Sequence, residues 1–138
     1  MYNNMDKSVF KDFNNIYFDF LNFLKRFSNG DKMFNDFYRK SYIIKQTNIK
    51  LIIKLWYDNI TLLYNKEIEE GNIDFFLNKN YNLENNKIEN FDTTYNINLY
   101  INFFRKQYNV LDNTIIQSFI HYVQQLNKLS LIYFKNDI

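Results

Sequence analysis

The stretch from Asp112 to Phe134 constrains the fold of this chain more than any other. Its apolar residues recur at alternating steps of four and three, which places them on one face of a helix of about six turns. They are Ile115, Phe119, Tyr122, Leu126, Leu129 and Tyr133, with Ile116, Ile120 and Val123 in a second row beside them. The opposite face carries Gln117, His121, Gln124, Gln125 and Lys128. So wide an apolar face must be covered by other helices, and the pattern therefore predicts an all-α fold.

A segment near the start of the chain, from Asp6 to Phe27, has the same spacing. Its apolar residues are Phe10, Phe13, Tyr17, Phe20, Leu24 and Phe27, with Ile16 and Leu21 beside them. Two long helices with matching apolar rows are expected to pack together, antiparallel or nearly so, at the centre of a bundle. Gly30 is expected to end the first helix, because glycine readily adopts the positive φ of a helix C-terminus. Residues 1–5 are expected to form a frayed tail.

Two further helices are predicted in the middle of the chain. Asp31 is a suitable N-cap for the first, which extends to about Lys45. Its inner face is Met33, Phe34, Phe37, Tyr38 and Ser41. Thr47 and Asn48 predict a break with a new N-cap, although a continuous, bent helix is an alternative. The next helix runs from Ile49 to about Glu69 and is closed by Gly71. Its apolar positions are Ile49, Ile52, Ile53, Trp56, Ile60, Leu63 and Tyr64.

Residues 72–93 are rich in Asn, Lys and Glu and predict a loop, with one short helical turn over 73–77. A helix of about four turns follows, capped by Asp92, Thr93 or Thr94. It would face inward through Ile97, Tyr100, Ile101, Phe104 and Tyr108. Asp112 or Thr114 would cap the final helix. The sequence thus predicts one domain over residues 1–138, a compact bundle of about five helices with a partly irregular Asn-rich connection. Trp56 and residues 73–77 are expected to close one end of the core.

Composition excludes several classes of protein. The chain has no Cys, which removes disulfides, thiolate catalysis and thiolate metal sites. A net charge of +2 is too small to predict a polyanion as partner. No apolar run approaches the roughly 20 residues of a membrane helix, so no membrane insertion is expected. Charged residues stand where a signal peptide would need an apolar segment, which predicts a soluble protein that is not secreted.

Residues able to do chemistry are few. His121 is the only histidine, and its place on the polar face predicts a solvated side chain. Glu67, Glu70 and Asp74 could hold a divalent cation or supply a carboxylate pair, but such clusters are usually solvated helix ends. We therefore predict no catalytic residue, no cofactor site and no metal site, and a protein that is not an enzyme.

Charge is unevenly distributed along the chain. Residues 25–54 contain eight basic and two acidic residues, a net charge of +6. Residues 58–92 contain three basic and eight acidic residues, a net charge of −5. The basic stretch predicts contact with an acidic protein partner or, alternatively, with the phosphates of nucleic acid. The residues proposed for that contact are Arg39, Lys40, Lys45, Lys50 and Lys54.

Aromatic residues exceed what one core of this size easily hides: 15 Phe, 12 Tyr and 1 Trp. Those that fall off the predicted apolar faces are expected to meet a partner. They include Tyr2 and, as proposed interface residues, Tyr42, Tyr57, Tyr81 and Tyr95. The favoured function is a protein–protein interaction or structural module that associates with itself, as a homo-oligomer, or enters a larger assembly. The abundance of Phe, Tyr, Asn, Ile and Lys is also typical of an AT-rich genome.

Three short motifs resemble small helical proteins of large nucleocytoplasmic DNA viruses, the giant viruses of protists and algae. They are Phe23-Leu24 to Phe27, Ile68 to Leu77 with Tyr81 following, and Tyr122 to Tyr133. Ser28 follows the first motif where those proteins often have Pro. The resemblance implies a virus-encoded protein in the host cytoplasm or the virion, and it implies no activity and no catalytic residue.

Overall fold

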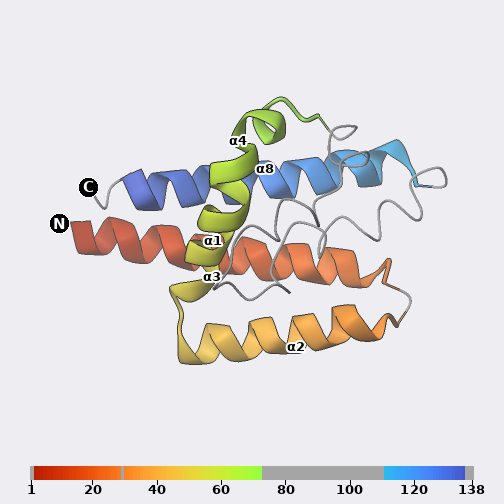
Figure 1. Cartoon of the computed structure of the whole chain (residues 1–138), viewed down its shortest axis with the longest axis horizontal. Helices are drawn as coiled ribbons and strands as arrows, with labels where there is room; N and C mark the ends of the chain where they lie inside the picture. Colours follow the sequence, from red (N-terminus) through yellow and green to blue (C-terminus); the bar gives the residue numbers. More distant parts are fainter. Residues whose placement is uncertain (1, 29, 73–110, 136–138) are drawn as a thin grey trace.

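The computed structural model describes residues 2–28, 30–72 and 111–135, with only the backbone for residues 2–7 and 33. These residues form an all-α structure (Figure 1). Its elements are α1 (Tyr2–Lys25), α2 (Lys32–Thr47), α3 (Leu51–Trp56), the π-helical turn η1 (Tyr57–Thr61), α4 (Leu62–Glu69) and α8 (Asn113–Lys135). Because α3, η1 and α4 run on without a break, the described residues contain four helical rods rather than about five. The predicted helix after residue 92 lies outside them.

The two long helices with matching apolar rows, α1 and α8, lie side by side and antiparallel (Figure 1). Phe10 of α1 meets Tyr133 near the end of α8, with ring centroids 6.5 Å apart. Further along α1, Phe23 meets Tyr122 at 5.3 Å, so the pairing runs in opposite directions along the two helices. This arrangement confirms the central prediction from the sequence. No helix within the described residues has both the length and the hydropathy needed to cross a membrane.

The first helix is buried on more than one side, because α2 lies along it opposite α8 (Figure 1). Its buried residues therefore include Phe18, which packs against α2, and Asn14, which donates to the Ile49 carbonyl, both outside the apolar rows expected from the sequence. Phe23, also outside those rows, is buried against Tyr122 of α8. On α2, Phe34 and Ser41 are buried as predicted. The centre of the bundle is thus α1, with neighbours on both flanks.

The third rod crosses α1 and α8 instead of running along them (Figure 1). Its Trp56 is 1% exposed, as predicted for a core residue. The indole meets the rings of Phe13, Tyr17 and Phe20, with centroids 6.2 Å away in each case. These three residues lie around the middle of α1, so Trp56 fills the middle of the core and does not close one end. Residues 73–77 lie outside the described part of the chain.

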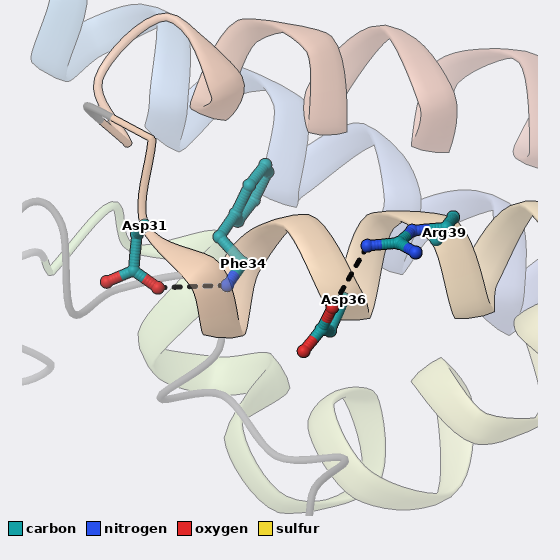
Figure 2. Close-up of polar contacts among 4 residues, drawn as sticks. All are labelled: Asp31, Phe34, Asp36 and Arg39. Atoms are coloured by element: carbon teal, nitrogen blue, oxygen red, sulfur yellow. Dashed lines mark hydrogen bonds and ion pairs between the residues drawn. The ribbon is translucent and has the colours of Figure 1, made fainter.

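The helix ends follow the predicted capping residues. Asp31 caps α2, and its Oδ1 accepts the Phe34 N–H at 3.0 Å (Figure 2). Asp112 rather than Thr114 caps α8, because its Oδ1 accepts the Thr114 N–H at 2.7 Å. Both glycines have positive φ, 77° at Gly30 and 68° at Gly71, and lie just after α1 and α4, which confirms the two predicted helix ends.

Two predicted helix boundaries need correction. The first helix begins at Tyr2 and not at Asp6, since no Pro or Gly in residues 2–5 prevents its extension over the expected tail. The break after Thr47 is present, but Asn48 ends α2 and does not cap α3. Its N–H donates to the Ile44 carbonyl, and no side chain caps the start of α3.

The π-helical turn overturns one prediction of the inner face. The Leu62 N–H donates to the Tyr57 carbonyl, five residues earlier, so the rod holds one extra residue in this turn. In an uninterrupted α-helix, Leu63 would lie about 20° from Trp56 around the helix axis, on the same side, and Ile68 would lie about 120° from it. The extra residue turns the rest of the rod back by about 100°, which brings Ile68 inward and carries Leu63 outward. Ile68 is accordingly buried and Leu63 is exposed, contrary to the predicted inner face.

Candidate interaction surface

The predicted basic residues do not form one continuous stripe, because α3 crosses α1 instead of following α2 (Figure 1). Two of them pair with carboxylates of their own rod. Arg39 Nη2 lies 3.1 Å from Asp36 Oδ1 (Figure 2), and Lys54 Nζ lies 2.7 Å from Asp58 Oδ2. All four side chains are well exposed, so each pair contributes about 0–1 kcal/mol to stability. The charges remain available at the surface.

Lys45 and Lys50 lie instead along the seam between α1 and the α2–α3 segment. The Lys45 ammonium lies over the ring of Phe18 at 5.1 Å from its centroid, and that of Lys50 lies over Phe10 at 5.6 Å. Neither has a carboxylate partner among the described residues. Ring faces attract cations, so these contacts fix two lysines on an aromatic seam.

The predicted interface tyrosines differ in their surroundings. Tyr42 is 48% exposed on α2, with its ring edge-on to Phe18 at 6.0 Å. Tyr57 is half-buried and stacks on Phe134, with centroids 4.3 Å apart. Tyr57 therefore packs within the chain, whereas Tyr42 faces solvent. Tyr81 and Tyr95 lie outside the described residues, as does the side chain of Tyr2.

A first candidate surface, the α2 face, combines apolar and basic side chains on the outer side of α2. Ile43 is 55% exposed beside Tyr42. Arg39 and Lys40, both exposed, lie four and three residues before Ile43, which places them one turn away on the same side of the helix. We define the α2 face by these four residues, Arg39, Lys40, Tyr42 and Ile43.

A second candidate surface, the α4 face, carries adjacent leucines. Leu62 is 60% exposed and Leu63 45%, and the exposure of Leu63 results from the π-helical turn before it. Glu67 and Glu70 lie one and two turns after Leu63, which gives this side of the helix an acidic end. The α4 face, defined as Leu62, Leu63, Glu67 and Glu70, was not predicted from the sequence.

Of the residues considered for chemistry, only His121 and Glu70 come near each other among the described residues. His121 is exposed, as its place on the polar face of α8 predicts, and lines an open hollow with Glu70 and Gln124. Glu67 is half-buried, Glu70 is exposed, and Asp74 lies outside the described residues. Within the described ranges, no three side chains of His, Asp or Glu are grouped as metal ligands would be.

A buried polar cluster joins the third rod to α8, and sequence reasoning missed it. Asn127 Oδ1 accepts the Trp56 Nε1–H at 2.7 Å and the Thr61 hydroxyl at 3.2 Å. The hydroxyls of Thr61 and Ser130 are 2.8 Å apart. The sequence contains one indication of this cluster. The second apolar row of the final helix, at positions 116, 120 and 123, continues at positions 127 and 130, and these two positions hold polar residues. Polar residues in a buried row must find partners there.

A smaller polar contact holds the end of α4. Gln124 of α8 donates through Nε2 to the carbonyls of Ile68 at 3.1 Å and Glu69 at 3.3 Å. These carbonyls belong to the last turn of α4, where backbone acceptors lack partners within the helix. Gln124 and the buried cluster together fix the orientation of the α4 face relative to α8.

Comparison of the chain with protein-family models, curated proteins and solved structures finds no match.

Proposed function

We propose that this chain is a non-enzymatic protein–protein interaction module that associates with itself or enters a larger assembly. The observation that carries this proposal is a group of large apolar side chains between 43% and 60% exposed: Tyr42, Ile43, Ile49, Leu62 and Leu63. Four of them form two adjacent pairs, one on the α2 face and one on the α4 face. Paired apolar side chains ringed by charge are typical of surfaces that a partner covers.

The setting that we propose is viral. The resemblance of the Phe23, Ile68 and Tyr122 motifs to giant-virus proteins supports a role in the virion or in the virus factory of the host cytoplasm. Structural modules of such assemblies need self-complementary or partner-complementary surfaces and no reaction chemistry. The two exposed faces supply such surfaces.

Sedimentation velocity over a wide range of protein concentration tests self-association. We expect the mean mass to rise above the monomer mass of 17.1 kDa as concentration increases. A Gln117→Ala variant, changed at an exposed residue of α8 that belongs to neither face as defined, should behave as the parent chain. A monomer at every concentration, with no protein captured from virions or infected cells, would refute the proposal.

Nucleic-acid binding is the second candidate function, favoured by the two lysines on the aromatic seam. Lys45 and Lys50 have no carboxylate partner among the described residues, and exposed Tyr42 lies beside Lys45. Cations beside an exposed ring suit single-stranded nucleic acid, whose phosphates and bases they would meet.

Titration with single-stranded DNA and RNA at several salt concentrations tests this second function. Replacing both lysines, Lys45→Gln with Lys50→Gln, should lower the slope of log K against log salt by about 1.4, because each phosphate contact on a single strand contributes about 0.7. Lys128→Gln, at an exposed position of α8, is the matched control and should leave the slope unchanged. Absence of binding at low salt would reject this function.

A further inference from the structure

We infer that the chain associates head to tail, with the α4 face of one copy packed against the α2 face of a second copy. This inference rests on the proposed self-association and specifies its contact. Both faces present two adjacent exposed apolar residues, Leu62 and Leu63 on one and Tyr42 and Ile43 on the other. Packed together, they would cover the most exposed large apolar side chains of the described residues.

The charges beside the apolar pairs are opposite in sign. Helix α2 carries four basic residues, Lys32, Arg39, Lys40 and Lys45, and one acidic residue, Asp36, a balance of +3. Residues 54–70 carry two basic residues, Lys54 and Lys66, and four acidic residues, Asp58, Glu67, Glu69 and Glu70, a balance of −2. Opposite potentials steer two such surfaces together, whereas two copies of either face would repel each other.

The two faces cannot meet within one copy. Helix α2 lies at one edge of the layer formed by α2, α1 and α8, while the rod that carries α4 crosses to the opposite edge (Figure 1). Along this rod, α3 is the part that contacts α2, and α4 follows it toward the opposite edge. The partner that satisfies both apolar pairs is a second copy of this chain.

A contact between different faces leaves one free face on each member of a pair. Every pair therefore still offers a free α2 face at one end and a free α4 face at the other, so association continues into a ring or an open filament. This growth distinguishes the head-to-tail contact from a two-fold dimer, which closes after one contact.

Two matched full-length variants test the inference. The first, Leu62→Gln with Leu63→Gln, removes the apolar pair of the α4 face. The second, Arg39→Gln with Ile43→Gln, weakens the α2 face. Gln keeps helix propensity and adds no charge, so the altered faces gain no new attraction for each other. Each variant alone should need about tenfold or more higher concentration to associate than the parent chain, a loss of about 1.4 kcal/mol.

The decisive measurement is an equimolar mixture of the two variants, studied by sedimentation velocity and native mass spectrometry. The first variant retains its α2 face and the second its α4 face, so the mixture should form a heterodimer that grows no further. If the parent chain associates but the mixture stays monomeric, the head-to-tail contact is refuted while self-association stands. Association of either variant alone at the parent's concentration refutes it equally. A parent chain that stays monomeric refutes self-association itself.

Far-UV circular dichroism controls for folding. All four replaced side chains are exposed, so the thermal midpoints should stay within a few degrees of the parent's. Should the paired leucine variant unfold, the single Leu62→Gln variant, changed at the more exposed leucine, takes its place in the mixture with the same expected result.

Discussion

Replacing Asn127 by Ala perturbs the buried cluster at its centre. Asn127 is 1% exposed, and its Oδ1 accepts two hydrogen bonds, from Trp56 and Thr61. The Thr61 hydroxyl keeps a partner in Ser130, 2.8 Å away, but the Trp56 N–H loses Asn127 Oδ1, which accepts its hydrogen bond in the parent chain. The perturbation thus leaves a buried indole donor without its acceptor, next to a small cavity.

The expected loss of stability has two parts. A buried donor without an acceptor costs about 1–3 kcal/mol, and the missing amide leaves a cavity that costs about 1 kcal/mol more. The free energy of unfolding should therefore fall by about 2–4 kcal/mol. For a chain of this length, about 3–4 °C of thermal midpoint corresponds to each kcal/mol, so the midpoint should fall by about 10 °C.

The assay is thermal and urea unfolding followed by far-UV circular dichroism, which does not depend on the single tryptophan. Gln117→Ala is the matched control, because it removes an exposed amide from the same helix. Its free energy of unfolding should change by less than about 0.5 kcal/mol. An equal effect in both variants would show that the buried cluster contributes nothing specific.

A double-mutant cycle isolates the hydrogen bond itself. Trp56→Phe removes the indole donor while keeping an aromatic ring against Phe13, Tyr17 and Phe20. Without the donor, Asn127→Ala no longer strands a buried N–H, so the double variant should be about 1–2 kcal/mol more stable than the two single effects predict. Additivity within about 0.5 kcal/mol would refute the assigned hydrogen bond.

Three further changes test the helix ends and the π-helical turn. Asp31→Ala removes the cap on the Phe34 N–H and should lower the free energy of unfolding, measured by thermal unfolding, by about 1 kcal/mol. The control Asp36→Ala removes only an exposed ion pair and should lower it by less than about 0.5 kcal/mol. Equal shifts in the two variants would contradict the capping role of Asp31. Gly71→Ala should lower the free energy of unfolding by about 1 kcal/mol, because a residue with a Cβ is strained at the positive φ of Gly71. Crowding adds nothing to this loss, since a Cβ at Gly71 meets only ordinary contacts at 3.7 Å. An unchanged thermal midpoint would rule out this backbone strain. Deleting Asp58 should lower the free energy of unfolding less than deleting Lys66 does, by about 2 kcal/mol or more. Only the deletion of Lys66 turns buried Ile68 out of the core. The reverse order in urea unfolding would refute the geometry of the π-helical turn.

The bundle was predictable because large apolar residues at steps of four and three leave little freedom in which faces meet. The antiparallel pairing of α1 with α8 followed from that spacing, and the two glycines marked helix ends that the structure contains. The burial of Phe18 and Phe23 did not follow, since it depends on which helices flank α1. A single sequence fixes the period of a helix but not the number of its neighbours.

The candidate surfaces were predictable only in part. The exposure of Tyr42 and the basic character of α2 could be read from residues that fall off the apolar faces. Lys54 and Arg39 were expected to act together, but the crossing of the rods separates them, and each pairs within its own rod. The α4 face could not be predicted, because residue spacing alone placed Leu63 on the inner side.

The π-helical turn connects the core to the proposed interface. The extra residue that carries Thr61 inward, to Asn127 and Ser130, also carries Leu63 outward, beside Leu62, which faces outward in either case. The two effects are inseparable, because a rigid rod turns as a whole about its axis. Satisfying the buried polar row of α8 therefore requires an exposed Leu63 on α4, and this completes the exposed leucine pair. Deletion of Asp58 tests this link too: α3 and α4 would then keep their relative faces without the π-helical turn, and self-association through the leucines should survive.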